Sequence, residues 1–173
     1  MTLNFGSGDN RLNNCINIDI SKVTKPDIVC DVTGPLPFDS DTVDKIYFIH
    51  TIEHIHKSHH FEIFKEFNRV MKSNRNLVLA YPEFSKCATN WIENKKGMRE
   101  FWEATIFGRQ LWPSDAHVCA MNTSEVVELL SLAGFGKIKF GAEPEGDYYT
   151  ILVAEKVSNP HNYESVVARE IFD

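Results

Sequence analysis

Three short motifs near the start of the chain carry groups that can contact a bound ligand. The first, NFGSG at residues 4–8, contains a G-x-G turn whose glycines let backbone N–H groups approach a ligand closely. It is neither a full dinucleotide fingerprint nor a phosphate-binding P-loop. Asp19, eleven residues after Gly8, can accept hydrogen bonds from ribose hydroxyls. Asp31 can accept from an adenine amine, and the N–H of Val32 can donate to a ring nitrogen.

Histidines supply the candidate bases for removing a proton from a bound acceptor. His50 and His54 lie in the string HTIEH, and His117 follows Ser114-Asp115-Ala116. Imidazole is the commonest general base because its pKa lies near neutral pH. We take His117 and His54 as catalytic candidates, while a surface or packing role for each stays open. The four cysteines have no metal-ligand spacing, and we expect no metal site.

Short apolar runs bounded by turn residues must position these motifs, as in a parallel α/β sheet. We expect helices from Ser58, as N-cap, to Lys72 and from Asn122 or Thr123 to a left-handed Gly134. The expected strands are Thr2–Phe5, Cys15–Ile20, Asp27–Cys30, Asp44–Ile49, Leu77–Tyr81, Lys137–Gly141 and Tyr148–Glu155, with a turn at Glu143–Asp147 between the last two.

The connections between the first three strands are too short for ordinary crossover helices. Only Asp9–Asn14 and Ser21–Pro26 separate them, whereas a parallel crossover normally needs a dozen or more residues. We therefore expect reduced helices in this half and a poorly covered sheet face that includes some of Ile16, Ile18, Ile20, Ile28 and Val29. A second copy of the chain, which we favour, or a C-terminal helix at Tyr163–Phe172 would cover it.

The length of 173 residues and 43% apolar content predict one globular domain over residues 1–157, followed by a tail at 158–173. Residues 84–116 form an aromatic insert of one or two helices with all three tryptophans, part core and part substrate lid. A net charge of −6 argues against nucleic-acid binding. No apolar run is long enough to span a bilayer, and no signal peptide is visible, so we expect a cytoplasmic protein without membrane contact.

The string VCDVTGPLPFDSDTVDKIYFIHTIEHI resembles class I S-adenosylmethionine (SAM)-dependent methyltransferases of the type 11 group. These carry D-x-x-x-L-P-F and then a strand that begins with Asp and ends near L-E-H. LNFGSG followed closely by NIDIS resembles a subfamily of short predicted methyltransferases with a compact first half. The resemblance implies a Rossmann-like fold with a mostly parallel sheet and an antiparallel last strand.

The resemblance also implies roles for individual residues. Phe5, Gly6, Ser7 and Gly8 would line the methionine part of SAM, Asp19 with Ile20 the ribose, and Asp31 with Val32 the adenine; His50 and Thr51 would lie by the SAM amino acid. Asn4 stands where Asp is more usual, and Ser73–Asn76 replaces the usual Pro-Gly-Gly turn.

Three functions remain open on these grounds. The favoured one is a methyltransferase acting on a small molecule or glycan-type precursor. The second is a catalytically degenerate SAM- or S-adenosylhomocysteine (SAH)-binding module or partner subunit. The third is another nucleotide-binding α/β protein.

Overall fold

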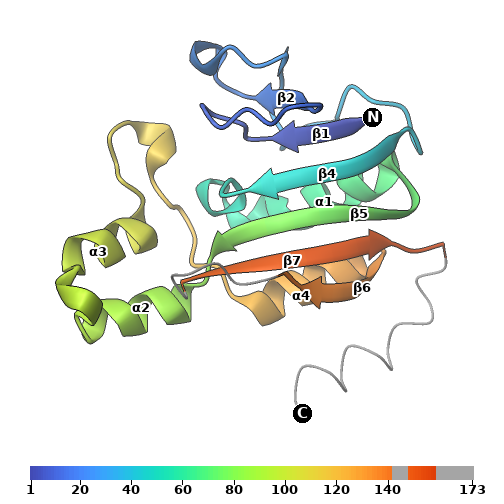
Figure 1. Cartoon of the computed structure of the whole chain (residues 1–173). Coiled ribbons are helices and arrows are strands. Elements are labelled where there is room, and N and C mark those ends of the chain that lie inside the picture. The colour runs from blue at the N-terminus through green and yellow to red at the C-terminus, as the bar shows by residue number, and fades with distance from the viewer. Residues whose placement is uncertain (142–147, 159–173) are drawn as a thin grey trace.

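The computed structural model describes residues 1–141 and 148–158, which form one seven-stranded sheet with helices (Figure 1). The strand order is β3-β2-β1-β4-β5-β7-β6. The strands are β1 (Thr2–Phe5), β2 (Ile16–Asp19), β3 (Ile28–Val29), β4 (Val43–Ile49), β5 (Met71–Pro82), β6 (Phe135–Phe140) and β7 (Tyr149–Lys156). The α-helices are α1 (His60–Val70), α2 (Phe84–Ile92), α3 (Arg99–Phe107) and α4 (Thr123–Leu132). The 3-10 turns are η1 (Lys22–Thr24), η2 (Ile52–His54), η3 (Lys57–His59), η4 (Lys95–Gly97) and η5 (Pro113–Asp115).

The sheet is parallel from β3 through β5, and β7 runs antiparallel to both of its neighbours. The expected mostly parallel sheet with an antiparallel last strand is therefore confirmed. The carboxyl ends of β1, β2, β4 and β5 point to one edge, and α2 and α3 project from that edge (Figure 1). None of the helices in residues 1–141 and 148–158 is long and apolar enough to cross a membrane.

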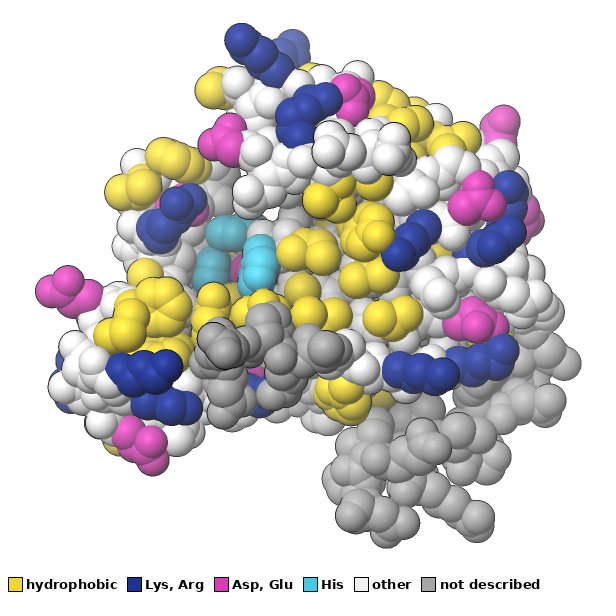
Figure 2. Space-filling model, viewed as in Figure 1, with side chains coloured by type: hydrophobic (Ala, Val, Ile, Leu, Met, Phe, Trp, Pro, Cys, Tyr) yellow, Lys and Arg dark blue, Asp and Glu magenta, His cyan; other side chains and the backbone are white. Residues whose placement is uncertain are grey.

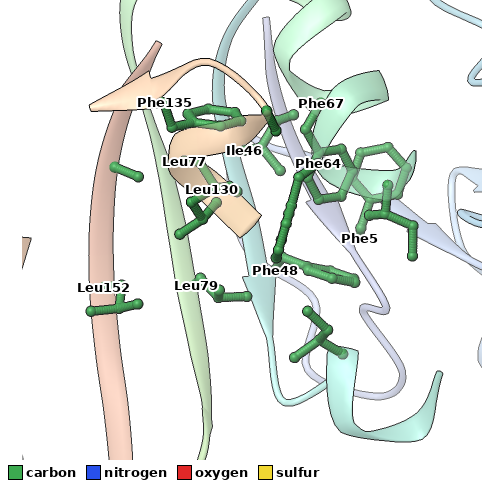
Figure 3. Close-up of a cluster of buried hydrophobic side chains, with 14 of the residues drawn as sticks. Phe5, Ile46, Phe48, Phe64, Phe67, Leu77, Leu79, Leu130, Phe135 and Leu152 are labelled. Carbon is green, nitrogen blue, oxygen red and sulfur yellow. The ribbon is translucent and has the colours of Figure 1, made fainter. Parts of the chain in front are cut away.

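One face of the sheet, here called the closed face, packs against α1 and α4. Alternating residues of the strands point into this layer because successive side chains in a strand alternate between faces. Phe67 of α1 contacts Phe5 and Phe48 with ring centroids 5.1 Å apart in each case. Leu79 and Leu130, both fully buried, belong to the same cluster (Figure 3). This apolar layer is the core of the protein.

The opposite face, here called the open face, is covered by no helix within the described residues (Figure 1). The side chains that register brings together across β4, β5 and β7 are apolar: Tyr47 pairs with Val78 and Val78 with Val153. All three are only half-buried. In Figure 2, hydrophobic side chains form a band over this face. The reduced helix cover in the first half of the chain is as expected: of the strand residues expected to need cover, Ile20 and Val29 are exposed, whereas Ile18 is fully buried on the closed face.

A polar network takes the place of helices over β1 and β2. Asn17 accepts from Asn4 Nδ2 at 2.9 Å and from the N–H of Leu12 at 2.8 Å, and its own amide donates to the Leu12 and Cys15 carbonyls. Asp27 accepts from the N–H of Asn17 at 2.8 Å. These bonds hold residues 6–15 against the open face, so Asn4 and Asn17 are buried although both are polar.

The structure corrects the expected boundaries around α1. Ser58 lies in η3 and does not cap α1, whose N-cap is His59 without a side-chain bond. The helix ends at Val70, because Met71 already pairs with Val43 at the start of β5. The register between β4 and β5 shifts after this pair, and Asn74 takes a left-handed φ of 59°. The segment expected to be a turn before the strand is thus an irregular part of it.

The other expected elements lie close to their predicted positions. Asn122 caps α4 by accepting from the N–H groups of Ser124 and Glu125, and Gly134 follows the helix with φ +90°. The aromatic insert forms two helices, α2 and α3, as expected. The turn predicted at 143–147 and the helix predicted at 163–172 lie outside the described residues.

Candidate functional site

The turn after β1 is built so that its backbone lies against the end of β4. Gly6 has φ +65°, and a Cβ built there would lie 2.2 Å from Oγ1 of Thr51. Thr51 Oγ1 also donates to the carbonyl of Phe5 at 3.4 Å. Glycine is required at residue 6 both by its left-handed backbone and by this close approach. The ends of β1 and β4 therefore lie in contact, with the backbone of the G-x-G turn against Thr51.

Asp19 lies directly beside the glycine turn. Its Oδ2 accepts from the N–H of Gly8 at 2.8 Å, and its Oδ1 accepts from the N–H of Ser21 at 2.8 Å. Each carboxylate oxygen keeps one further lone pair for a ligand. The hydroxyl of Ser7 is buried without a hydrogen-bond partner in the described part of the chain. This edge thus offers acceptors and a hydroxyl group that the fold itself does not use up.

Asp31 and Val32 follow β3, next to β2 in the sheet. Asp31 Oδ1 accepts from the N–H and the hydroxyl of Thr33 at 2.9 and 2.7 Å, which fixes the orientation of the carboxylate. Oδ2 of Asp31 and the N–H of Val32 have no partner among residues 1–141 and 148–158. The pair therefore presents an acceptor and a donor next to each other, as an adenine edge requires.

One of the predicted cofactor residues, Phe5, does not point into this edge as a side chain. Phe5 is 1% exposed and packs against Phe38 and Phe67 in the core, so only its backbone reaches the edge. Ile20 is 62% exposed at the end of β2. The structure thus brings Gly6, Gly8, Asp19 and Thr51 into contact, with Asp31 one strand further along.

His50 directly follows β4 and has a strained left-handed conformation, with φ 48°. Its Nδ1 lies 3.4 Å from Oε1 of Glu53, and its ring makes an edge contact with Tyr149 at 5.4 Å between centroids. Glu53 is 1% exposed, and its other oxygen, Oε2, has no partner among the described residues. A buried carboxylate with one unused oxygen is therefore part of the site.

The structure brings the two candidate bases together. The His54 and His117 rings contact edge to face with centroids 4.8 Å apart. Nδ1 of His54 lies 3.0 Å from the carbonyl of Ala116 and must donate to it, which leaves Nε2 as the free basic nitrogen. Burial lowers the pKa of His117, against an opposing effect of Glu53. Burial therefore favours the neutral form of His117, the form that can accept a proton.

An aromatic chain links the insert to this site. Phe101 and Trp102 of α3 contact Tyr148, which contacts Tyr149 at 5.0 Å between centroids, and Tyr149 contacts His50. Histidine side chains gather beside the apolar band, toward the insert, in Figure 2. The insert therefore forms one wall near the histidines. A cleft of about 300 Å³ between η3 and the start of α4 contains none of the predicted residues.

Sequence reasoning missed Glu53 and Tyr149 as members of the site. In the sequence, Glu53 is part of HTIEH but nothing there marks it as buried. Its burial depends on residues 116–119, which pack over η2. The N–H of Val118 donates to the Glu53 carbonyl at 2.9 Å. Tyr149 joins because β7 pairs with β5 and places Tyr149 opposite Pro82. Neither long-range pairing leaves a local signal in the sequence.

Comparison with known proteins identifies the fold. Residues 6–79 match the family model described as a methyltransferase domain. A SAM-dependent methyltransferase from Archaeoglobus fulgidus superposes with a TM-score of 0.67 at 15% identity, over 90% of this chain and 85% of that one. A SAM-dependent methyltransferase from Methanosarcina mazei gives 0.64 at 15% identity, over 90% and 92%. No curated protein matches the sequence.

A third similar structure is a complex of two proteins. It is a putative methyltransferase from Haloferax volcanii in complex with the Trm112 methyltransferase activator, with a TM-score of 0.61, 14% identity and 91% and 82% coverage. At these identities the structural likeness concerns the fold. Together with the family match, it confirms the resemblance to class I methyltransferases that the motifs of the first half indicate.

Proposed function

We propose that this chain, which has the class I methyltransferase fold, binds SAM at the carboxyl ends of β1, β2 and β3. We propose further that it transfers the methyl group to a small molecule or glycan-type precursor. The observation that carries the proposal is the contact of Gly6 with Thr51 together with the Gly8–Asp19 hydrogen bond. These contacts hold a backbone cradle and a carboxylate at one edge, where open α/β sheets bind their ligands.

The proposal assigns the residues to the parts of SAM in order along the edge. Gly6–Gly8 and Thr51 would hold the methionine part, and the free lone pairs of Asp19 would accept from the ribose hydroxyls. Asp31 Oδ2 and the Val32 N–H would pair with the adenine edge. SAM supplies an electrophilic methyl group on a sulfonium, and the acceptor must lose a proton when it is methylated. His54 Nε2 or His117 would accept that proton.

Titration calorimetry of the full chain with SAM, SAH and NAD tests cofactor binding. We expect SAM and SAH to bind and NAD not to bind. Asp19→Ala should weaken SAH binding by roughly 10- to 150-fold, because it removes a charge-assisted hydrogen bond of about 1.5–3 kcal/mol. Asp39→Ala is the matched control, since Asp39 is exposed and precedes β4 at the other edge. Unchanged SAH affinity of a folded Asp19→Ala protein would refute the assignment.

The insert of α2 and α3 is proposed as the acceptor-side wall. The support is the aromatic chain from Trp102 through Tyr148 and Tyr149 to His50. A bound acceptor would disturb this chain, so we expect tryptophan fluorescence to change when acceptor joins the cofactor complex. Fluorescence that stays constant at saturating cofactor and acceptor would count against a lid role.

A catalytically degenerate binding subunit is the second candidate. Asn4, where Asp is more usual, is 4% exposed and is used by Asn17 and the carbonyl of Asn10. The Haloferax volcanii relative in complex with an activator is a precedent for a partner-dependent methyltransferase. Turnover of labelled SAM on a panel of sugar nucleotides and small hydroxy compounds separates the two candidates. Binding of SAH with no turnover would favour the binding subunit.

We also propose that a second copy of the chain covers the open face. Tyr47, Val78 and Val153 form one row, Ile49 and Ile151 lie in the next, and all are half-buried. Monomers rarely expose large contiguous apolar patches, and two-fold dimers are the commonest homo-oligomers. Sedimentation should show a dimer for the full chain and a monomer for Val78→Lys. A chain ending at Val157 that stays dimeric would exclude the C-terminal tail as the cover.

A strictly monomeric full chain at every concentration would refute the dimer. Contact with nucleic acid or membrane is not part of the proposed function, given the net charge of −6. A cytoplasmic location stays a prediction.

A further inference from the structure

Glu53, His54 and His117 form a cluster that the proposed cofactor site does not use. Each offers one ligand atom, and these three atoms lie within 4.8 Å of one another. Two ligands of one zinc ion lie roughly 3–4 Å apart, given bonds of about 2.0–2.2 Å. A contraction of about 1 Å, within reach of small side-chain rotations, would bring all three onto one ion. We propose that this cluster is a binding site for a divalent transition-metal ion of the zinc type.

The carboxylate of Glu53 is the first argument. The side chain is 1% exposed, and Oε2 has no hydrogen-bond partner among the described residues. A buried oxygen of this kind costs free energy unless something compensates it. Oε1 lies 3.4 Å from Nδ1 of His50, so the two oxygens have different surroundings. A cation beside Oε2 would supply the missing partner.

The orientation of His54 is the second argument. Its Nδ1 donates to the carbonyl of Ala116 at 3.0 Å, so Nε2 carries the lone pair. Histidines that bind metals usually donate their other ring N–H to a carbonyl or carboxylate, which fixes the ring. The hydrogen bond to the Ala116 carbonyl therefore fixes the His54 ring in the way that is usual for a metal-binding histidine.

The backbone around the cluster is the third argument. The N–H of Val118 donates to the Glu53 carbonyl at 2.9 Å, and the N–H of His117 donates to the Phe107 carbonyl at 3.0 Å. Gly108 pairs with Ala116, and a Cβ at Gly108 would lie 2.0 Å from the Asp115 carbonyl oxygen. Two distant segments are thus fixed side by side before any ion binds.

Two imidazoles and one carboxylate define the metal class. They suit Zn²⁺, Co²⁺ and neighbouring ions, whereas Mg²⁺ and Ca²⁺ prefer sets of oxygen ligands. Three protein ligands leave a coordination position open, as in catalytic zinc sites. The cysteine spacing could not reveal this site, because its ligands are a glutamate and two histidines, and they come from residues 53–54 and 117.

This inference deepens the proposed function and rests on it for the role of the ion. An acceptor hydroxyl would take the open position, and the ion would stabilise its oxyanion while the proton leaves to water. The oxygen then bonds to the methyl carbon, the methyl–sulfur bond breaks, and its electron pair stays on the sulfur of the neutral thioether. His54 and His117 would then be metal ligands in place of the base role proposed above, because a nitrogen bound to the ion has no lone pair left for the proton. The acceptor class would be a hydroxyl compound.

The experiment uses the full chain without an affinity tag, freed of metal by a chelator. Calorimetric titration with Zn²⁺ and the visible spectrum with Co²⁺ report binding without any turnover. We expect one Zn²⁺ per chain and no binding of Mg²⁺. His117→Ala and His54→Ala should each lose more than the about 10- to 100-fold affinity that an outer-shell change costs. His59→Ala, at an exposed histidine outside the cluster, should bind as the parent does.

Glu53→Gln guards against variants that fail to fold. Without metal it should melt at or above the temperature of the parent, because it removes a buried charge, and it should lose the rise in melting temperature that Zn²⁺ gives the parent. Equal Zn²⁺ affinity in the parent and in the folded His117→Ala protein would overturn the inference. SAH titration on the same samples separates the two claims. A chain that binds SAH but no metal refutes only the ion, and one that binds metal but no SAH refutes the proposed cofactor site.

Discussion

Leu79 and Val78 are neighbours in β5, but they lie on different faces of the sheet. Leu79 is fully buried in the apolar cluster that α1 and α4 cover, whereas Val78 is half-buried on the open face. The closed face is held by packed rings and aliphatic chains, and the open face over β1 and β2 is held by the amides of Asn4 and Asn17. Part of a sheet face can therefore be covered by a connection held with side-chain hydrogen bonds, without a helix.

The largest expected effect is on the closed face. Leu79→Ala should lower the free energy of unfolding by about 2–5 kcal/mol, because it leaves a cavity in the core. Val78→Ala is the matched control on the open face and should cost about 1 kcal/mol in dilute monomer. Urea denaturation of both proteins checks the difference. If both substitutions lowered the free energy of unfolding equally, the two faces would be equally packed and the contrast between them would be refuted.

The next effect tests the polar network. Asn17→Ala should cost about 2–3 kcal/mol, because it leaves the Leu12 N–H without its partner and the buried Asn4 amide with only the Asn10 carbonyl at 3.3 Å. Asn13→Ala, at an exposed position of the same connection, is the control and should be close to neutral. Denaturant melts measure both. If Asn17→Ala were as stable as Asn13→Ala, the network would not be what holds residues 6–15.

The smallest effect concerns an ion pair at the rim of the closed face. Hydrogen bonds from Arg69, helped by the Leu36 N–H, lower the pKa of Glu66 to about 2. The native state thus binds the proton less readily than the unfolded chain, in which the pKa is near 4.5. This stabilisation is present above pH 4.5 and is lost as pH falls toward 2. Glu66→Gln should cost about 1 kcal/mol at pH 7.

The pH dependence supplies the check for Glu66. The difference in unfolding free energy between parent and Glu66→Gln should shrink as pH falls from 4.5 toward 2. A difference that stays constant over this range would show that the Glu66 carboxylate does not stabilise the loop at Leu36 through its charge.

Much of the fold could be predicted from the sequence, because its signals are local. The buried strands read as apolar runs, and the Asn122 cap and Gly134 mark the ends of α4. The predicted start of α1 was wrong because Ser58 lies in η3, where its N–H donates to His56 Nδ1 and its hydroxyl bonds the same nitrogen, so it does not cap the helix. The burial of Asn4 and Asn17 has no such local signal, because it depends on the hydrogen bonds that join them and the Leu12 backbone.

The site was predictable only in its first half. Gly6, Asp19 and Asp31 are close in sequence to the strands that present them, so their edge followed from the sheet topology. The meeting of Glu53 and His54 with His117 depends on how residues 107–118 return to η2, through the Val118–Glu53 bond. No periodicity encodes such a return, so the geometry had to come from the structure.

The short connection between β1 and β2 has a consequence for how the chain folds. Leu3 pairs with Ile16 and Ile18 with Ile28, whereas Leu3 also pairs with the much more distant Ile46. Each doubling of a loop adds about 0.6 kcal/mol of closure entropy, and local contacts form fastest. We expect β1, β2 and β3 to associate first. The proposed SAM site at the carboxyl ends of these strands would then be complete only when β4 pairs with β1 and places Thr51 against Gly6.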